Sequence, residues 1–464
     1  MNRNELTGLE IDLYHLDAVY IAWKGGTTGH STFELFTRST PFGGGFMVAA
    51  GLELAAEHIQ NFGYSEEDLE WIASVKGYDP EFLELLGNLK FTGDVLAMPE
   101  GEIAFGHQPL MQIQSAFIEG MLLESGLVRI LGVSTLIATK AARVHLAAKG
   151  RSFSDFSFRR AHAPLWATRS AYIGGAESSS YVAANKQLGI PGSGTIPHAI
   201  VQAFPDEISA FREIARIFPK YTLLIDTYDV DQGIDNAILA AKEEAATGSG
   251  HELVAVRIDS GDLGDWSRLV RSRLDAADMH NVRVLVSGDL DEHKIETLVS
   301  SGDPADGFGV GANLGVGLGS VESGHVGGVI GAVYKLTWIE DDNDSTQDAR
   351  MKIAGGKSTW PGRKSVYRVG DFDHDVISLS DEPAPANGRP LLQPWMKGGE
   401  LIGPHPSLSD IRDRSIANLN AMPENLKQLT VSEPYDVRFS DNIRALRESI
   451  EANHERRQSP SGGN

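Results

Sequence analysis

The sequence contains no cysteine among its 464 residues. Disulfide bonds, a thiolate nucleophile and zinc held by cysteine are therefore excluded. Basic residues are also few, since 41 lysines and arginines face 63 aspartates and glutamates, which gives a formal net charge of −22. A nucleic acid is an unfavourable partner for such a chain, because binding to its backbone rests on basic patches. A small phosphorylated substrate is not excluded, because a few arginines or a helix N-terminus can bind it locally.

Long hydrophobic runs are also missing. No stretch approaches the roughly 20 apolar residues that a membrane-spanning helix needs. Hydrophobic residues make up 41% of the chain and charged residues 22%, which is ordinary for a globular protein and too apolar for a disordered one. We therefore expect a soluble, cytoplasmic protein without a membrane partner. At about 100–200 residues per domain, the length predicts two or three domains, unless one of them is a large α/β barrel.

From residue 133 onward, short apolar or β-branched runs alternate with longer amphipathic segments. The expected strands cover residues 153–158, 194–197, 222–226, 253–258, 282–286 and 307–310. The expected helices cover residues 133–149, 178–188, 207–217, 234–245, 266–277 and 292–300. Strands that alternate with helices indicate parallel βαβ units, and six of them without a dinucleotide-binding glycine fingerprint favour a barrel over an open sheet. We expect the flanking segments, which mix short strands and helices, to pair as one discontinuous α/β domain.

Three of the predicted strands end in clusters of carboxylates. The clusters are IDTYD (residues 225–229), IDSGD (258–262) and SGDLD (287–291). One aspartate in such a place commonly caps the helix that follows. Three clusters in successive loops are harder to explain as caps, because these loops build the active-site rim of a parallel barrel. We expect the clusters to hold Mg²⁺ or ribose hydroxyls, with Asp226, Asp259 and Asp262 as the candidate metal ligands and Asp289 as a further contact.

Other strand ends carry groups that suit anions. Arg159 and Arg160 suit a carboxylate or a phosphate, although a surface salt bridge is the simpler interpretation of such a pair. His198 follows a glycine-flanked segment, and a base, a nucleophile and a helix cap all remain open for it. The glycine-rich turn at 308–313 and the Ser-Gly pair at 287–288 can present backbone N–H groups to a monophosphate. The residues alone predict an α/β-barrel enzyme that handles a sugar phosphate, and they do not name the reaction.

A series of motifs in a fixed order resembles nicotinate phosphoribosyltransferases along nearly the whole chain. The motifs are DLY (12–14), TFELFTRSTPFGGGF (32–46), FTGDVLAMPEGE (91–102), STLIATKAAR (134–143), SGTIPH (193–198), LIDTYD (224–229), VRIDSGDL (256–263), SGDLDE (287–292), FGVGANL (308–314), GAVYKL (331–336) and WPGRKSVYR (360–368). Each motif alone is modest, and their shared order makes the resemblance specific.

The resemblance implies the fold of type II phosphoribosyltransferases, an irregular α/β barrel joined to a discontinuous, sandwich-like α/β domain built from both chain ends. We place the domains at residues 1–132, 133–345 and 346–464, with a disordered tail from about residue 456. The resemblance also implies a homodimer with a shared active site. The implied reaction joins nicotinate to phosphoribosyl pyrophosphate with Mg²⁺, releases nicotinate mononucleotide and pyrophosphate, and is coupled to ATP hydrolysis through a phosphorylated histidine.

The motif match carries the family's functional residues onto this chain. It implies that His198 is the phosphorylated histidine, that Arg257 meets the nicotinate carboxylate and that Asp259 holds the ribose hydroxyls. The pyridine ring is expected between Phe156 and the residue at position 14 of the second subunit, which is Tyr14 in this sequence. The other expected substrate contacts are Arg159, Arg160, Thr195, Ser180, Asp226, Asp262, Ser287, Gly288, Asp289, Gly309 and Gly311.

Nicotinamide phosphoribosyltransferase is the nearest alternative function. Those enzymes place an aspartate where it accepts hydrogen bonds from the carboxamide, and the matching position in this chain lies near Ser180, which has no carboxylate. Nicotinate is therefore favoured, because a buried aspartate would repel the acid. Quinolinate phosphoribosyltransferases are shorter and have no phosphorylated histidine. A non-catalytic nucleotide-binding relative is disfavoured because His198, Arg257 and Asp259 are all present.

Overall fold

The computed structural model describes residues 8–320, 325–340, 347–354 and 357–458. The chain divides into two compact units, one formed by Met1–Leu136 with Val329–Asn464 and the other by Ile137–Gly328. Helix α6 (Glu124–Ala148) contributes residues to both units. None of the helices in the described ranges combines the length and the apolar character that crossing a membrane requires.

The first unit is built around mostly antiparallel sheets whose strands come from both ends of the chain. Apart from its part of α6, its described helices are α1 (Tyr14–Gly25), η2 (Pro41–Gly43), α2 (Leu52–Gln60), α3 (Glu66–Lys76), α4 (Pro80–Gly87), α5 (Phe117–Leu122), α15 (Leu408–Ala421), η3 (Glu424–Leu426) and α16 (Asp441–Gln458). Its described strands are β1 (His30–Thr37), β2 (Met47–Val48), β3 (Asp94–Ala97), β4 (Ile103–Ala104), β5 (Pro109–Ala116), β14 (Ala332–Glu340), β15 (Gln347–Ala349), β16 (Lys364–Val369), β17 (His374–Leu379), β18 (Gly388–Pro390), β19 (Gln393–Lys397), β20 (Glu400–Leu401) and β21 (Val437–Phe439).

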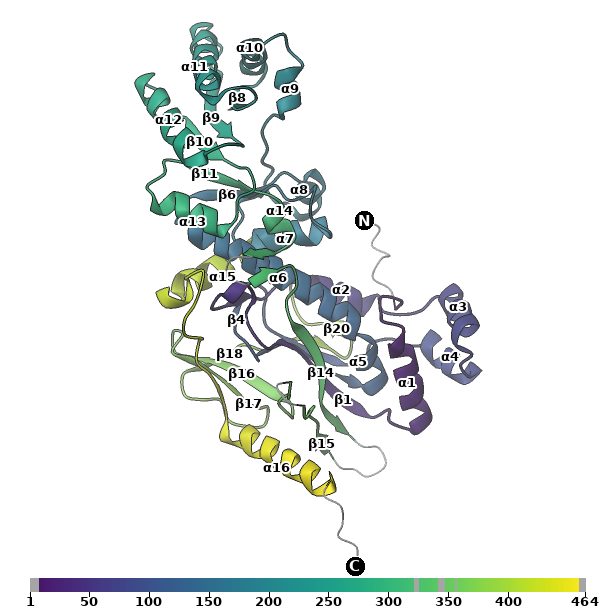
Figure 1. Ribbon diagram of the computed structural model, residues 1–464. Coiled ribbons are helices and arrows are strands. Elements are labelled where there is room, and N and C mark those ends of the chain that lie inside the picture. Colours follow the sequence, from purple (N-terminus) through teal and green to yellow (C-terminus); the bar gives the residue numbers. More distant parts are fainter. Residues whose placement is uncertain (1–7, 321–324, 341–346, 355–356, 459–464) are drawn as a thin grey trace, which may run out of the picture. The chain divides into compact units, whose positions relative to one another are not determined.

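The largest sheet of this unit confirms that the two chain ends form one discontinuous α/β domain. Its strand order is β15-β14-β1-β5-β3-β19-β20, so three strands from before residue 136 lie between two pairs of strands from after residue 329. Strand β14 lies beside β1 in antiparallel register, with Leu35 opposite Tyr334 (Figure 1). Residues 332–340, which the sequence placed with the barrel, belong to this sheet because β14 supplies the backbone partner of β1.

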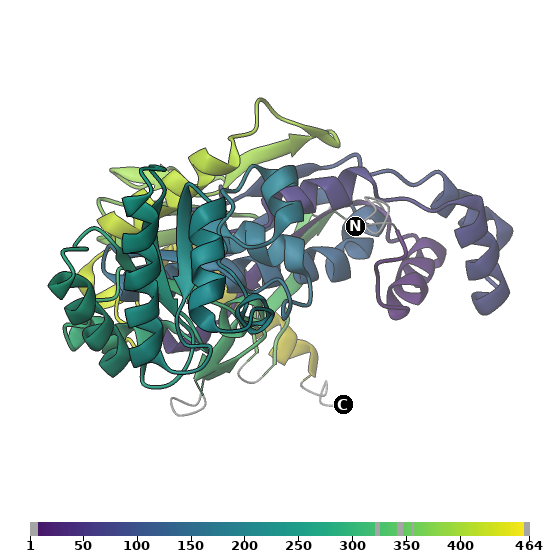
Figure 2. The ribbon, with the colours of Figure 1, turned by 90° about the horizontal axis from the view of Figure 1, so that it is seen from above.

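The first unit also contains a helix pair, a four-stranded sheet and the C-terminal helix. Helices α3 and α4 pack side by side, and both views show them as a pair (Figures 1 and 2). A four-stranded sheet has the order β18-β16-β17-β21 and contains the short strands expected in the C-terminal segment. The predicted tail from residue 456 begins inside α16, which extends to Gln458, and residues 459–464 lie outside the described residues.

The second unit alternates strands and helices. Apart from its part of α6, its described helices are α7 (Pro164–Ile173), α8 (Val182–Leu188), α9 (His198–Gln202), α10 (Glu207–Ile217), α11 (Val230–Ala246), α12 (Leu263–Ala276), α13 (Glu292–Ser300) and α14 (Ala312–Gly315). Its described strands are β6 (Ser152–Asp155), β7 (Ser178–Ser179), β8 (Lys220–Leu224), β9 (Glu252–Ile258), β10 (Arg283–Val286), β11 (Gly307–Val310), β12 (Leu318–Ser320) and β13 (His325–Gly327).

The main sheet of the second unit has six parallel strands in the order β7-β6-β11-β10-β9-β8. Helices α11 and α12 pack on β9, and α12 also packs on β10 (Figure 1). Strands β7 and β8 are the two edges of the sheet and do not pair with each other in the described part of this unit. The expected irregular α/β barrel is therefore an open half-barrel.

The local predictions in this unit hold where strand and helix periods are clear. Helices α10 and α13 match their predicted bounds. The apolar side chains of β9 are largely buried, and those of Val256 and Ile258 have no exposed surface. Residues 194–197 are not a strand, because this glycine-containing segment makes no sheet pairing in the structure. The helix predicted from residue 178 begins only at Val182, and residues 178–179 form the edge strand β7.

A buried ion cluster connects α6 to α13 within the second unit. Glu292 has no exposed surface, accepts the Nε–H of Arg143 at 3.0 Å, and forms an ion pair with the ammonium of Lys140. Burial alone would raise the pKa of Glu292, but the charges of Lys140 and Arg143 outweigh it and hold that pKa below its ordinary value. Glu292 is therefore ionised and pairs with both buried cations.

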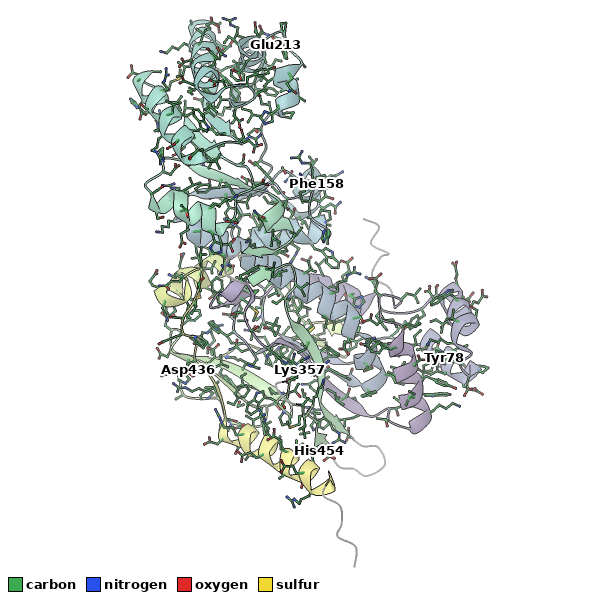
Figure 3. The ribbon with its side chains drawn as sticks, in the orientation of Figure 1. Tyr78, Phe158, Glu213, Lys357, Asp436 and His454 are labelled. Atoms are coloured by element: carbon green, nitrogen blue, oxygen red, sulfur yellow. The ribbon has the colours of Figure 1, made fainter. Side chains whose placement is uncertain are left out.

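Replacing Glu292 by glutamine is expected to lower the free energy of unfolding by about 3–5 kcal/mol, because two buried cations lose their counter-charge. Urea unfolding followed by circular dichroism measures the change. Glu213→Gln is the matched control and should leave the free energy of unfolding nearly unchanged, because Glu213, labelled in Figure 3, pairs with Arg216 on the exposed side of α10. Equal stability of the two variants would contradict the role given to the cluster.

Candidate active site

The carboxyl ends of β6, β9, β10 and β11 border one cavity of about 530 Å³ in the second unit. Loops that follow parallel strands lie at the same edge of a sheet, so residues far apart in the sequence meet there. The cavity is lined by Phe156, Phe158, Arg159, Arg160, Ser180, Gly194, Thr195, Ile196, Pro197, His198, Arg257, Asp259, Ser287, Gly288, Asp289, Gly309, Gly311 and Ala312.

Each carboxylate cluster contains one residue that caps a helix. Asp229, Asp262 and Asp291 are the N-caps of α11, α12 and α13, and each side chain accepts the N–H of the residue three positions later. Asp259, which comes directly after β9, and Asp289, the third residue after β10, line the cavity instead. Each cluster therefore supplies a helix cap, and two of the three also place an aspartate in the lining of the cavity.

Asp226 lies behind the cavity rather than in its lining. Only 9% of the residue is exposed. Its Oδ2 accepts the N–H of Asp259 at 2.7 Å and the hydroxyl of Ser260 at 2.7 Å. Asp226 therefore holds the loop that carries Asp259.

The carboxylate of Asp259 connects three groups of the cavity. Its Oδ1 accepts the hydroxyl of Ser287 at 2.5 Å and lies 3.4 Å from Nη1 of Arg257, which also donates to Ser287 Oγ at 3.2 Å. Its Oδ2 lies 3.9 Å from Nε2 of His198. The side chain of Arg257 is 13% exposed and that of Asp259 is 32% exposed. Arg257 and Asp259 compensate each other's charge in this partly desolvated site. The site therefore holds a guanidinium that can meet an anion and a carboxylate that can stabilise a developing cation.

His198 has a hydrogen-bond partner at one ring nitrogen and faces a carboxylate with the other. It is the first residue of α9, its Nδ1 lies 3.2 Å from Oγ1 of Thr227, and its Nε2 faces Asp259. Thr227 is a functional candidate that the sequence reasoning missed. The signal that could have found it is its position directly after Asp226 in a strand-end cluster.

Two glycines bring the strand-end loops close together. Gly288 has φ 104°, and a Cβ there would lie 2.2 Å from the carbonyl oxygen of Asp259. A Cβ on Gly309 would lie 2.5 Å from the ring of Phe156. Only glycine allows this close approach, so the two residues set the positions of Asp259 and Phe156.

Known proteins share both the sequence and the fold of this chain. Residues 9–132 match the N-terminal domain of nicotinate phosphoribosyltransferase (NAPRTase), and residues 384–447 match its C-terminal domain. The Mycobacterium tuberculosis protein named nicotinate phosphoribosyltransferase pncB2 is 36% identical over 449 residues, which cover 95% of this chain and 93% of that protein. The Bacillus subtilis nicotinate phosphoribosyltransferase is 35% identical and is covered to 94%, again over 95% of this chain. The chain belongs to the nicotinate phosphoribosyltransferase family.

A solved structure supports the same assignment at the level of the fold. The crystal structure of human nicotinic acid phosphoribosyltransferase superposes with a TM-score of 0.81 at 28% identity, covering 95% of this chain and 99% of the human chain. The resemblance inferred from the motifs is thus confirmed, and so is the type II phosphoribosyltransferase-like fold.

The cavity of this family member brings together most of the residues named from the sequence. Thirteen of them lie in its lining: Phe156, Arg159, Arg160, Ser180, Thr195, His198, Arg257, Asp259, Ser287, Gly288, Asp289, Gly309 and Gly311. Asp226 supports the lining, Asp262 caps α12, and Tyr14 begins α1 of the first unit with 55% of its surface exposed. Their functional roles remain predictions.

The sequence reasoning missed Phe158. Phe158, labelled in Figure 3, stacks its ring on Tyr181 with centroids 4.2 Å apart. It is a second aromatic side chain in the lining of the cavity. The preceding Phe156 carried the aromatic prediction, and no separate sequence signal distinguished the two rings.

A divalent cation fits this cavity only with ligands from the substrate. No group of three or more histidine, aspartate or glutamate side chains in the described ranges is arranged to hold a metal ion. Of the three predicted metal candidates, only Asp259 lines the cavity. Mg²⁺ is commonly held by one or two carboxylates together with substrate phosphates and water, and a single carboxylate satisfies that requirement.

Gly288→Ala is expected to lower kcat/KM about 100-fold, because the new Cβ would push against the backbone of Asp259 and displace the site. The free energy of unfolding should fall by about 1–3 kcal/mol. Steady-state kinetics and urea unfolding measure the two effects. Gly302→Ala is the control, since Gly302 also has a positive φ of 74° but no atom within 4 Å of its Cβ position. A similar loss of activity in both variants would show that backbone strain, and not the contact with Asp259, is responsible.

Proposed function

We propose that this protein transfers the phosphoribosyl group of phosphoribosyl pyrophosphate to nicotinate, and that it serves NAD biosynthesis by salvaging nicotinate. The products are nicotinate mononucleotide and pyrophosphate. The observation that carries the proposal is the single cavity in which Arg257, Asp259 and the Ser287–Gly288 loop meet, in a chain of the nicotinate phosphoribosyltransferase family.

Arg257 is the group that meets the nicotinate carboxylate. A guanidinium has five N–H donors, and the contacts of Arg257 to Asp259 and Ser287 both use Nη1. Donors therefore remain for a planar carboxylate, which arginine binds in a bidentate manner. Ser180 also lines the cavity and brings no negative charge, so the acid is not repelled there. The ring of Phe156, with Phe158 beside it, offers an apolar wall for the pyridine.

Asp259 acts on the ribose. In the reaction the bond from C1′ to the pyrophosphate oxygen breaks and the lone pair of the pyridine nitrogen forms the new bond to C1′. No proton has to be removed from the nucleophile, and positive charge develops on the ribose. The Asp259 carboxylate, fixed by Ser287 and Arg257, stabilises that charge.

The phosphate groups have partners at two sides of the cavity. The backbone of residues 287–289 and 309–312 suits the 5′-phosphate, and Arg159, Arg160 and Thr195 are available for the other phosphates. Mg²⁺, held by Asp259 and the substrate, would neutralise charge on the departing pyrophosphate.

His198 is the proposed site of transient phosphorylation by ATP. The γ-phosphoryl group of ATP would pass to a ring nitrogen, ADP would leave, and water would later release phosphate. Its ring is held by Thr227 and Asp259 at the edge of the cavity, and its side chain is 41% exposed, which leaves it accessible to a nucleotide. The added negative charge would order the neighbouring arginines.

The reaction is tested by product analysis with nicotinate, nicotinamide or quinolinate, each with phosphoribosyl pyrophosphate and with or without ATP. Nicotinate mononucleotide should form from nicotinate, more efficiently with ATP, while the other two substrates should give little product. Product from nicotinamide alone would reject the proposal in favour of nicotinamide phosphoribosyltransferase. The absence of any product, together with binding of nucleotides, would indicate a non-catalytic relative.

In His198→Ala, ATP is expected no longer to stimulate product formation, and no acid-labile phosphoenzyme should form. Slow product formation without ATP should continue. Labelling with ATP carrying a radioactive γ-phosphate, followed by acid and base treatment, measures the phosphoenzyme. Full ATP coupling in this variant would place the phosphorylated residue elsewhere. The exposed His280→Ala serves as the control and should be labelled like the native protein.

A further inference from the structure

Asn313 joins two loops that line one side of the cavity. Residues 287–289 follow β10, and residues 311–312 follow β11. The Nδ2 of Asn313 donates to the carbonyl oxygen of Asp289 at 3.2 Å and to that of Leu290 at 3.1 Å. Because both partners are acceptors, the side chain must present its NH₂ group, and a carboxylate of the same shape could not replace it.

The loop that Asn313 holds has an unfavourable backbone conformation. Asp289 has φ 48°, and Gly288 before it has φ 104°. A left-handed conformation costs a non-glycine residue about 1–2 kcal/mol, so it persists only where neighbouring contacts hold it. The carbonyl oxygen of Asp289 also accepts the ammonium of Lys294 at 2.8 Å. Three donated hydrogen bonds therefore fix this part of the loop.

The N–H groups of the loop remain available. Those of Gly288, Asp289 and Leu290 donate no hydrogen bond to any residue in the described ranges. Peptide units are planar, so holding the carbonyl oxygens of residues 289 and 290 fixes the directions of the N–H groups of residues 290 and 291. The same contacts restrain the turn that carries the N–H groups of Gly288 and Asp289, both of which line the cavity. Backbone N–H groups held in this way at a cavity form an anion site.

We propose that Asn313 is a positioning residue that locks the 287–290 loop into a backbone cradle for a phosphate monoester, the 5′-phosphate of the phosphoribosyl group. This inference rests on the proposed function. Asn313 does not touch the substrate in this arrangement. It acts through the carbonyl groups of the neighbouring loop, and Lys294 supports the same loop from α13.

The test compares two ligands that differ only in this phosphate, nicotinate mononucleotide and nicotinate riboside. In Asn313→Asp, carboxylate oxygens face two carbonyl oxygens, and the loop should open. Isothermal titration calorimetry should show the Kd for the nucleotide rising about 10- to 100-fold, while the Kd for the riboside changes less than about twofold. The KM for phosphoribosyl pyrophosphate should rise by a similar factor, and kcat should change little.

Asn61→Asp is the matched control. Asn61 also donates its amide to a main-chain carbonyl, that of Glu57 at 2.8 Å, but it lies at the exposed end of α2 in the first unit. Its binding of both ligands should equal that of the native protein. Lys294→Met is the second variant and should show a smaller loss that is again confined to the nucleotide. If thermal unfolding shows that Asn313→Asp does not fold, the result for Lys294→Met tests the inference in its place.

An equal loss of affinity for both ligands, or an unchanged affinity for the nucleotide, would overturn the inference about Asn313. Failure of the native protein to bind nicotinate mononucleotide is a different result. It would reject the proposed function itself, and with it the identity of the anion.

Discussion

The cavity depends on the carboxylate of Asp259. A partly buried carboxylate must be compensated, and here one oxygen takes Ser287 and Arg257 while the other faces His198. Its main-chain N–H is held in turn by Asp226, and its carbonyl oxygen is so close to Gly288 that no side chain fits between them. The ends of three strands, β8, β9 and β10, and the first residue of α9 meet at this one residue. The positions of the arginine, the histidine and the phosphate loop are consequences of that pairing.

The fold of the second unit was largely readable from the sequence because its periodic signals are strong. Apolar runs such as 253–258 are flanked by helices of clear amphipathic period, and this alternation specifies a parallel sheet. The closure of the sheet was not readable, because it depends on the pairing of distant edges and not on local pattern. The same holds for residues 332–340, which the sequence placed with the barrel. Their partner β1 lies some 300 residues earlier in the chain, and nothing local identifies that partner.

The sequence predicted where the candidate site lies better than it predicted which task each of its residues has. Carboxylates after successive parallel strands must gather at one edge, so Asp259 and Asp289 were found without the fold. The sequence could not separate these residues from Asp229, Asp262 and Asp291. An aspartate suits both a helix cap and a cavity lining, and where a cluster holds both kinds of aspartate they lie only two or three residues apart. Supporting contacts such as that of Thr227 with His198 depend on three-dimensional distance and escaped the sequence entirely.

The open half-barrel has a consequence for solubility. A closed barrel has no free strand edges, whereas in the described residues of this sheet β8 has no strand on its outer side and β7 is bonded there only to the irregular segment 191–193. Unpaired edges can recruit strands of other molecules into aggregates. Strand β7 is only two residues long, which offers little backbone to a foreign strand. Strand β8 is preceded by Pro219 and begins with Lys220, whose side chain is 74% exposed. Proline cannot donate a backbone hydrogen bond, and the charge of a lysine resists desolvation. Both edges of the incomplete barrel are therefore protected against self-association.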